Sequence, residues 1–334
     1  MKAVQVSGPG KDFEVVEKPT PEPGEYDVLI KVEACGVCHS DMFVKEGAFP
    51  GIEYPRIPGH EVVGIVDKVG SRITHFNPGD RVGVGWHGGH CFQCNSCRDG
   101  DFINCEQAKI CGISYDGGYA EYMVAPHEAV ARIPDGLKSE EAAPILCAGI
   151  TVFNAMRNAG VRPGDVCAIQ GVGGLGHLAI QYANKMGLHT VAISTSDDKK
   201  ELAEKLGAHQ YINAKKENPV EELQKLGGAN LIVATAPNSE AISSVVDGLG
   251  ANGKLMVAGA SADPMQISPF QLIMGKRQIA GWSSGTAKDS EDTLNFSALT
   301  QSLPIIETYP LEQAAEAYDR MMTNQARFRT VIVP

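Results

Sequence analysis

The most restrictive feature of the chain is a glycine-rich segment, Gly171-Val172-Gly173-Gly174-Leu175-Gly176, which directly follows the apolar run 166–170. It has the spacing G-x-G-x-x-G, and helical periodicity continues after it to Met186. Gly171 is expected to permit a tight turn, Gly173 to admit a ligand close to the backbone, and Gly176 to let the helix pack against the strand. The pattern therefore predicts a strand, turn and helix whose N-terminal N–H groups attract phosphates.

Apolar runs and helical segments alternate from Gly164 onward, which is typical of a parallel sheet covered by helices. Helices are expected at 174–186, 198–206 and 239–249. Six strands are expected, at 166–170, 190–194, 211–212, 231–235, 254–258 and 278–282. In this context the glycine loop indicates a Rossmann-type dinucleotide site, and the alternative is an ordinary glycine-rich turn.

The end of the second strand indicates which dinucleotide is preferred. An NAD site usually has an acidic residue about 20 positions after the loop, where it holds the ribose 2′-hydroxyl. Here that position is Ser194, followed by Thr195, Ser196 and, after two aspartates, Lys199. Hydroxyls and a nearby cation suit a 2′-phosphate, so we expect NADP to be preferred over NAD. The alternative is that Asp197 or Asp198 reaches the 2′-hydroxyl.

The first 150 residues differ from the later ones in composition and pattern. They are rich in Gly, Pro and Cys and contain β-like runs at 27–34, 62–69 and 81–84 between turn signals, which predicts an all-β, barrel-like domain. The C-terminal tail contains a helical segment at 311–322 and a β-like run at 329–333. Because it fits neither a further strand–helix repeat nor a linker, the tail is expected to return to the first domain.

Composition excludes several classes of partner. The 334 residues hold 29 basic and 40 acidic side chains, a formal charge of −11, which would repel nucleic acids and anionic membranes. No apolar stretch approaches the ~20 residues of a spanning helix, and the N-terminus lacks a signal-peptide pattern, so a cytoplasmic location is expected. Nine cysteines, an odd number, favour metal ligation or catalysis over a disulfide framework.

Four cysteines lie within 15 residues, at Cys91, Cys94, Cys97 and Cys105. Four thiolates closing on one ion make a structural zinc site with no open position for chemistry. The redox alternative uses one vicinal pair and leaves two cysteines unexplained. Cys111 lies beyond the cluster and is expected to be a small buried residue.

A second group of metal-binding residue types is dispersed. Cys35 and Cys38 form a C-x-x-C pair that could be redox-active or half of a zinc site, His60 follows at some distance, and Cys147 comes much later. Two cysteines and one histidine are a recurring ligand set of catalytic zinc, which keeps a fourth position open. Taken singly, a buried His60 or Cys147 is more often a core residue than a ligand.

Six motifs occur in the order and approximate spacing of one family. The chain resembles the zinc-dependent medium-chain alcohol dehydrogenases in the segments 38–41, 59–61, 91–105, 117–122, 146–151 and 171–176. The resemblance covers nearly the whole chain. It implies an α/β protein with a GroES-like catalytic domain at 1–148 and 287–334, interrupted by a Rossmann domain at 149–286.

The resemblance also implies the roles of the dispersed group. Cys38, His60 and Cys147 would hold a catalytic zinc, and Cys35 would not be a ligand. Glu61 would lie behind the metal, and Asp41 would accept a hydrogen bond from the free nitrogen of His60. The fourth position would bind the alcohol oxygen, and hydride would pass to the nicotinamide.

Further positions match the proton path and the cofactor contacts of the family. Ser40 matches the hydroxyl that begins the proton relay, but Phe43 stands where many members end it with a histidine. His39 matches a residue that contacts the cofactor pyrophosphate. Thr151 and Arg329 match contacts to the nicotinamide side and the phosphates, although Arg329 could equally be a surface charge.

The expected substrate is an apolar alcohol. Phe49 and Trp86 match positions that line the substrate pocket, and Phe43 could add to it; the alternative is that these aromatics serve only as core. The expected activity is interconversion of primary aliphatic or aromatic alcohols and aldehydes by a homo-oligomer, dimer or tetramer, with two zinc ions per chain. The alternatives are a polyol, secondary alcohol or cinnamyl-type substrate, NAD preference, and a zinc-containing redox sensor without enzymatic activity.

Overall fold

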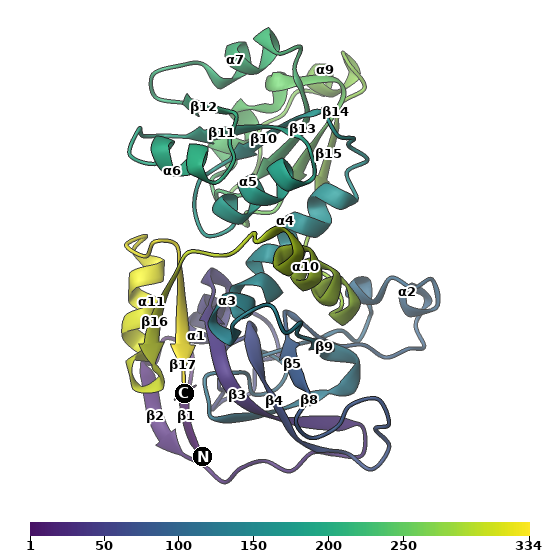
Figure 1. Ribbon diagram of the computed structural model, residues 1–334, viewed down its shortest axis with the longest axis vertical. Coiled ribbons are helices and arrows are strands. Elements are labelled where there is room, and N and C mark those ends of the chain that lie inside the picture. The colour runs from purple at the N-terminus through teal and green to yellow at the C-terminus, as the bar shows by residue number, and fades with distance from the viewer. The chain divides into compact units, whose positions relative to one another are not determined.

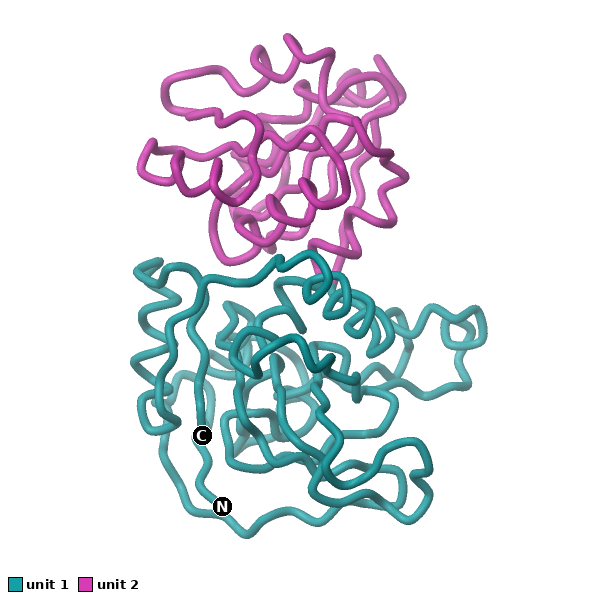
Figure 2. Tube along the Cα trace, in the orientation of Figure 1, with its two compact units in different colours: residues 1–150, 284–334 teal, residues 151–283 magenta.

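The computed structural model describes residues 1–334, which form two compact units. Residues 1–150 and 284–334 make up the first unit and residues 151–283 the second (Figure 2). The first unit is therefore interrupted in sequence by the second. The unit boundaries lie two or three residues from the expected ones at 148/149 and 286/287.

The second unit contains a six-stranded sheet in the order β12-β11-β10-β13-β14-β15, in which every neighbouring pair is parallel (Figure 1). The sheet is parallel, as the alternating pattern predicts, and sequence order reads outward in both directions from β10, which makes it doubly wound. The strands are β10 (Val166–Gln170), β11 (His189–Ser194), β12 (Gln210–Asn213), β13 (Ala229–Ala234), β14 (Leu249–Val257) and β15 (Gln278–Gly281).

The helices of this unit differ in places from the expected ones. The segment that begins at residue 239 is helical only to Ser244 and continues as a 3₁₀ turn. The helix ends there because Val245 and Val246 are β-branched and Gly248 disfavours a helix. Strand β14 then begins five residues earlier than predicted. The helices are α4 (Ala148–Arg157), α5 (Gly176–Lys185), α6 (Lys200–Lys205), α7 (Pro219–Lys225), α8 (Ser239–Ser244) and α9 (Pro269–Ile273).

The glycine loop connects β10 to α5. Gly171 has φ +98°, a left-handed conformation that side chains other than glycine rarely adopt. A Cβ at Gly176 would overlap the carbonyl oxygen of Gly171, whereas a Cβ at Gly173 would meet no atom within 4 Å. Gly171 and Gly176 are therefore required by the turn itself, and Gly173 faces open space.

The first unit is built on a seven-stranded sheet in which β8 pairs with β3 beside the main path β16-β17-β3-β4-β5-β9. Its strands are β3 (Asp27–Val37), β4 (Val62–Val69), β5 (Arg81–Val84), β8 (Tyr122–Pro126), β9 (Val130–Arg132), β16 (Ile306–Pro310) and β17 (Arg329–Val333). Two small antiparallel pairs complete the unit: β1 (Lys2–Val6) with β2 (Phe13–Glu17), and β6 (His87–Gly89) with β7 (Lys109–Ile110).

The C-terminal tail returns to the first unit, as its sequence predicts. Strand β17 runs antiparallel to β3, with Thr330 opposite Val37 and Ile332 opposite Cys35, so strands from the two ends of the chain lie side by side (Figure 1). The helical segment of the tail, α11 (Ala314–Met322), starts after a 3₁₀ turn and not at Leu311. The other helices of this unit are α1 (Met42–Glu46), α2 (Asn95–Arg98), α3 (Ser139–Ala142) and α10 (Ala287–Thr300).

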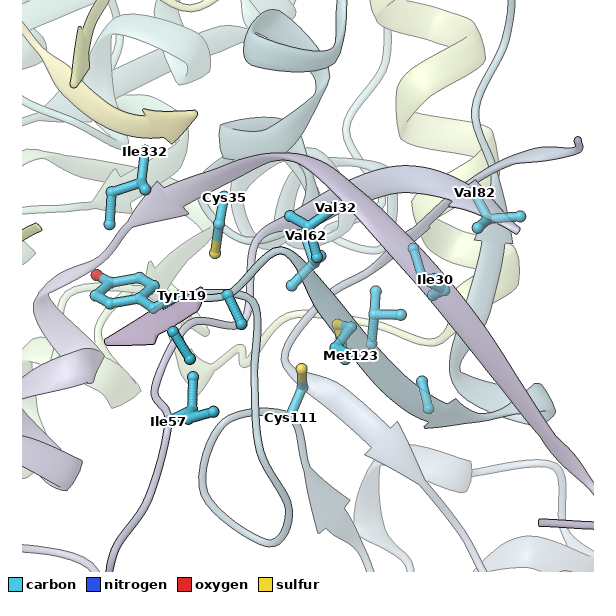
Figure 3. Close-up of a cluster of buried hydrophobic side chains, with 14 of the residues drawn as sticks. Ile30, Val32, Cys35, Ile57, Val62, Val82, Cys111, Tyr119, Met123 and Ile332 are labelled. Atoms are coloured by element: carbon cyan, nitrogen blue, oxygen red, sulfur yellow. The ribbon is translucent and has the colours of Figure 1, made fainter. Parts of the chain in front are cut away.

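The main core of the first unit lies against β3 and β4. Cys35, Val62, Tyr119 and Ile332 are fully buried in it and come from four separate segments, as Figure 3 shows. The apolar contacts of this cluster therefore hold the N-terminal and C-terminal pieces together. None of the helices in the chain combines the length and apolar composition of a membrane span.

Substitution of Gly176 by Ala is expected to destabilise the second unit by about 1–3 kcal/mol, because the new Cβ must displace the Gly171 backbone. Gly173→Ala, which adds a methyl group to open space, is the matched control and is expected to leave the unfolding midpoint unchanged. Urea unfolding of both variants measures this, and equal stability of the two would contradict the packing role of Gly176.

Candidate metal centres and cofactor site

The four-cysteine segment folds into a lobe in which all four sulfur atoms lie within 4.8 Å of one another. The Sγ atoms of Cys91 and Cys97 are 4.0 Å apart, and those of Cys94 and Cys105 are 3.9 Å apart. The backbone N–H groups of Gln93 and Cys94 donate to Cys91 Sγ and lower the pKa of that thiol to about 6. Four sulfur atoms gathered at this distance suit one tetrahedral zinc ion, which binds cysteine as the thiolate.

The dispersed group also comes together, in the first unit. Cys38 follows the end of β3, His60 and Glu61 directly precede β4, and Cys147 directly precedes α4. One ligand atom from each of these four residues lies within 4.8 Å of the others, and the Sγ atoms of Cys38 and Cys147 are 3.8 Å apart. Three segments that are distant in sequence therefore bring two thiols and an imidazole to one point.

The imidazole of His60 is held from one side and open on the other. Its Nδ1 lies 3.1 Å from Asp41 Oδ1, which is the contact implied by the resemblance. Its Nε2 is buried and has no hydrogen-bond partner. A buried nitrogen without a partner is costly unless something binds it. The unpartnered Nε2 beside two thiols fits a zinc ion.

Glu61 forms a buried ion pair with Arg329, the first residue of β17. Both side chains are at least 95% buried, so the reading of Arg329 as a surface charge is wrong. Arg329 also donates a hydrogen bond to the carbonyl oxygen of Val37 over 3.0 Å. Burial raises the pKa of the Glu61 carboxyl group to about 7, although the positive charge of Arg329 opposes that rise. Glu61 Oε2 and Arg329 Nε have no partner.

The remaining thiols stand apart from both clusters. Cys35 is buried and points its sulfur toward the carbonyl oxygen of Gly36, and Cys111 is buried near the carbonyl oxygen of Gly59. Cys167 is buried in β10, where burial raises the pKa of its thiol to about 12. Their environments are those of small core side chains.

The predicted relay and pocket residues lie on the segment after Cys38 and around His60. Ser40 is partly buried and His39 is exposed, both in the 3₁₀ turn His39–Asp41. The Trp86 ring meets the His60 ring edge-on at a centroid distance of 5.0 Å. The Phe43 ring lies 5.8 Å from that of Phe49 and 6.3 Å from that of Trp86, so these three aromatics form one patch beside His60.

Tyr119 contacts this site, although no pattern in the sequence indicates a role for it. The Tyr119 hydroxyl donates to Asp41 Oδ2 over 2.9 Å. Tyr119 belongs to the segment 117–122, which contributed to the resemblance without an assigned role. The contact joins residues 78 positions apart, and no local pattern indicates it.

Except for Thr151, the predicted cofactor residues of the second unit lie in the segments that follow β10 and β11 or at the end of β11. Val172, Gly174 and Leu175 lie in the loop, and Ser194 ends β11 with 9% exposure. The Nζ of Lys199 donates to the carbonyl oxygen of Val172 over 2.9 Å, so its cation lies on the glycine loop. Thr195 is exposed, Ser196 is partly exposed, and Thr151 is buried in α4.

The carboxylate of Asp197, one of the two alternatives for holding the ribose 2′-hydroxyl, is bound to other side chains of the protein. It accepts a hydrogen bond from Asn213 Nδ2 over 2.7 Å and forms an ion pair with Lys216, both of which lower the pKa of its carboxyl group. Ser196 donates to Asp198. Of the two carboxylates that could hold a ribose hydroxyl, Asp197 is therefore engaged with the last residue of β12 and with the segment that follows it.

Comparison with known proteins agrees with this geometry. The family model described as the alcohol dehydrogenase GroES-like domain matches residues 24–135, and the one described as zinc-binding dehydrogenase matches residues 174–299. An alcohol dehydrogenase of Penicillium expansum, patD, is 47% identical over 325 residues, covering 97% of this chain and 94% of its own.

Two other relatives span the full length. An alcohol dehydrogenase of Geobacillus stearothermophilus is 39% identical over 334 residues, covering 99% of both chains. The solved structure of a cinnamyl alcohol dehydrogenase from Sorghum bicolor superposes with a TM-score of 0.90 at 30% identity, covering 99% of this chain and 97% of that one. From these matches, the chain belongs to the zinc-dependent medium-chain alcohol dehydrogenase family.

Proposed function

We propose that this dehydrogenase interconverts primary aliphatic or aromatic alcohols and aldehydes, prefers NADP and carries two zinc ions per chain. The observation that carries the proposal is the cluster of Cys38, His60 and Cys147, in which His60 Nε2 is buried without a partner. A zinc ion held there supplies a Lewis acid for the substrate oxygen. The four-cysteine lobe has no open position and is proposed as the structural site.

The residues around the cluster orient it. Asp41 accepts from His60 Nδ1 and so fixes the ring tautomer that leaves Nε2 free to act as a ligand. Arg329 pairs with the Glu61 carboxylate, which lies beside the ligand atoms. Ser40 is proposed to take the alcohol proton, because a hydroxyl can accept one proton and pass on another. Since Phe43 has no group that can receive a proton, the path beyond Ser40 leads to water or to another side chain.

The aromatic patch supports an apolar substrate. Phe43, Phe49 and Trp86 offer ring faces and edges and no charge to pair with a carboxylate or phosphate. A cinnamyl-type aldehyde is the second candidate, because its planar, conjugated chain suits aromatic walls and because the Sorghum bicolor relative is a cinnamyl alcohol dehydrogenase. A panel of aliphatic, benzylic and cinnamyl alcohols and aldehydes, assayed with both cofactors, separates these candidates.

The preference for NADP rests on the end of β11. Ser194 stands where an NAD enzyme usually has a carboxylate, Asp197 is bound to Asn213 and Lys216, and the Lys199 cation lies on the glycine loop. A 2′-phosphate in this region would meet hydroxyls and a cation. The chain is also expected to be a cytoplasmic homo-oligomer, dimer or tetramer, and light scattering of the purified protein measures its oligomeric state.

NADP is expected to exceed NAD at least tenfold in kcat/KM. Lys199→Met is expected to weaken NADPH binding by about tenfold, or ~1.4 kcal/mol, with little change for NADH, because only NADPH carries the 2′-phosphate. Titration of cofactor fluorescence measures both dissociation constants. Lys205→Met, at the end of the helix α6 that follows Lys199 and paired with the exposed Glu201, is the control. A tenfold preference for NAD in the unmodified enzyme would contradict the proposal.

Ser40→Ala is expected to lower kcat by about 10²-fold or more, because the alcohol proton then lacks its first acceptor. Zinc content is expected to stay unchanged, since Ser40 is not among the clustered ligands. Ser71→Ala, an exposed serine of the same unit, serves as the control for steady-state kinetics. Near-normal turnover in Ser40→Ala would rule out the relay.

Metal analysis by mass spectrometry is expected to find two zinc ions per chain, and one in Cys147→Ala. Cys35→Ala removes a buried thiol of the same unit that lies outside both clusters and is expected to keep two ions. A single ion in the unmodified protein, retained in Cys147→Ala, would instead favour a zinc-containing redox sensor.

A further inference from the structure

The segment Gly117-Gly118-Tyr119 packs directly against the chain that leads into His60. The backbone N–H of Gly117 donates to the carbonyl oxygen of Ile57, that of Gly118 to Gly59 and that of Tyr119 to Pro58, over 2.8–3.1 Å. A Cβ at Gly117 or Gly118 would overlap neighbouring atoms. The two glycines therefore allow this segment to lie against the approach to His60.

The Tyr119 ring fills the space beside Gly59. A Cβ on Gly59 would lie 2.6 Å from Tyr119 Cδ1, and Gly59 itself has φ +103°. The ring is fully buried in the same cluster as Cys35, Ile57 and Ile332 (Figure 3). Phe would fill this apolar site equally well, and a buried hydroxyl is costly unless it has a partner. Packing alone therefore gives no reason for a tyrosine here.

The partner of the hydroxyl is Asp41, whose two carboxylate oxygens are both engaged. Oδ2 accepts from the Tyr119 hydroxyl and from the backbone N–H of Cys38, each over 2.9 Å. Oδ1 lies 3.1 Å from His60 Nδ1. With Oδ2 bound to two donors from different segments, the carboxylate cannot rotate away from His60 without breaking a buried hydrogen bond.

From this arrangement we infer that Tyr119 is a positioning residue of the catalytic metal site. It fixes the Asp41 carboxylate, which in turn sets the orientation of the His60 ring and hence the direction of Nε2 toward the ion. The inference rests on the proposed ligand set Cys38, His60 and Cys147. The segment 117–119 thus supports the ligand-bearing segments 38–41 and 57–60 at once, through its backbone and through one hydroxyl.

The test is zinc retention in Tyr119→Phe, which keeps the ring and removes only the hydroxyl. Partners of metal-ligating histidines are typically worth 10–100-fold in metal affinity, so zinc release from this site to a chromogenic chelator is expected to accelerate at least tenfold. Release from the four-cysteine lobe is expected to stay unchanged and is the internal reference. The Cys147→Ala variant identifies which kinetic phase belongs to which site.

Two variants separate positioning from a purely structural role. Tyr115→Phe removes another buried hydroxyl of the same unit, one that lies beside the Cys111 thiol, and is expected to release zinc as the unmodified enzyme does. In an Asp41→Asn background the Tyr119 hydroxyl no longer orients a carboxylate, so Tyr119→Phe is expected to add less than twofold to zinc release.

The outcomes are distinct. If the unmodified enzyme binds two zinc ions and Tyr119→Phe releases both at the normal rates, or loses both equally as its stability falls, Tyr119 is not a positioning residue. If the unmodified chain binds zinc only in the four-cysteine lobe, the proposed function itself fails. Selective, accelerated loss from the site of Cys38, His60 and Cys147, absent in Tyr115→Phe, supports the inference.

Discussion

The buried ion pair between Glu61 and Arg329 is the constraint on which the first unit depends. Removing a carboxylate and a guanidinium from water costs several kcal/mol per ion unless each finds the other with good geometry. Because Arg329 begins β17 and Glu61 precedes β4, the pair forms only when the C-terminal tail has crossed back to lie beside β3. The charge requirement and the strand pairing therefore select the same interrupted topology.

The proposed ligands of the two metal centres are brought together in different ways, by one short segment in the first and by three distant segments in the second. The lobe of Cys91, Cys94, Cys97 and Cys105 draws all its sulfur atoms from one short segment, whose backbone N–H groups donate to Cys91 Sγ. The cluster of Cys38, His60 and Cys147 draws on three segments and needs the whole sheet in place. Asp41, held by Tyr119 and by the Cys38 backbone, connects two of these segments through polar contacts that tolerate little displacement.

Much of this organisation could be predicted from local patterns. The parallel sheet of the second unit follows from alternating apolar and helical runs, and the glycine loop follows from spacing, because both depend on residues close together in sequence. Patterns of this kind failed where neighbours compete. The expected helix 239–249 stops at Ser244, since Val245, Val246 and Gly248 disfavour it. Arg329, read as a possible surface charge, is buried against Glu61. No local pattern could indicate that contact, because the two residues are 268 positions apart.

Local patterns in the chain were enough to predict the parallel sheet, the strand–turn–helix of the glycine loop and the two sets of metal-binding residue types, because spacing and periodicity express short-range geometry directly. The contacts between distant residues became visible only in the folded chain: Glu61 pairs with Arg329, Asp197 binds Asn213 and Lys216, and Tyr119 donates to Asp41. These contacts join segments that are separate in the chain. Their energies arise from burial and hydrogen bonding, which exist only once the sheets have formed and excluded water.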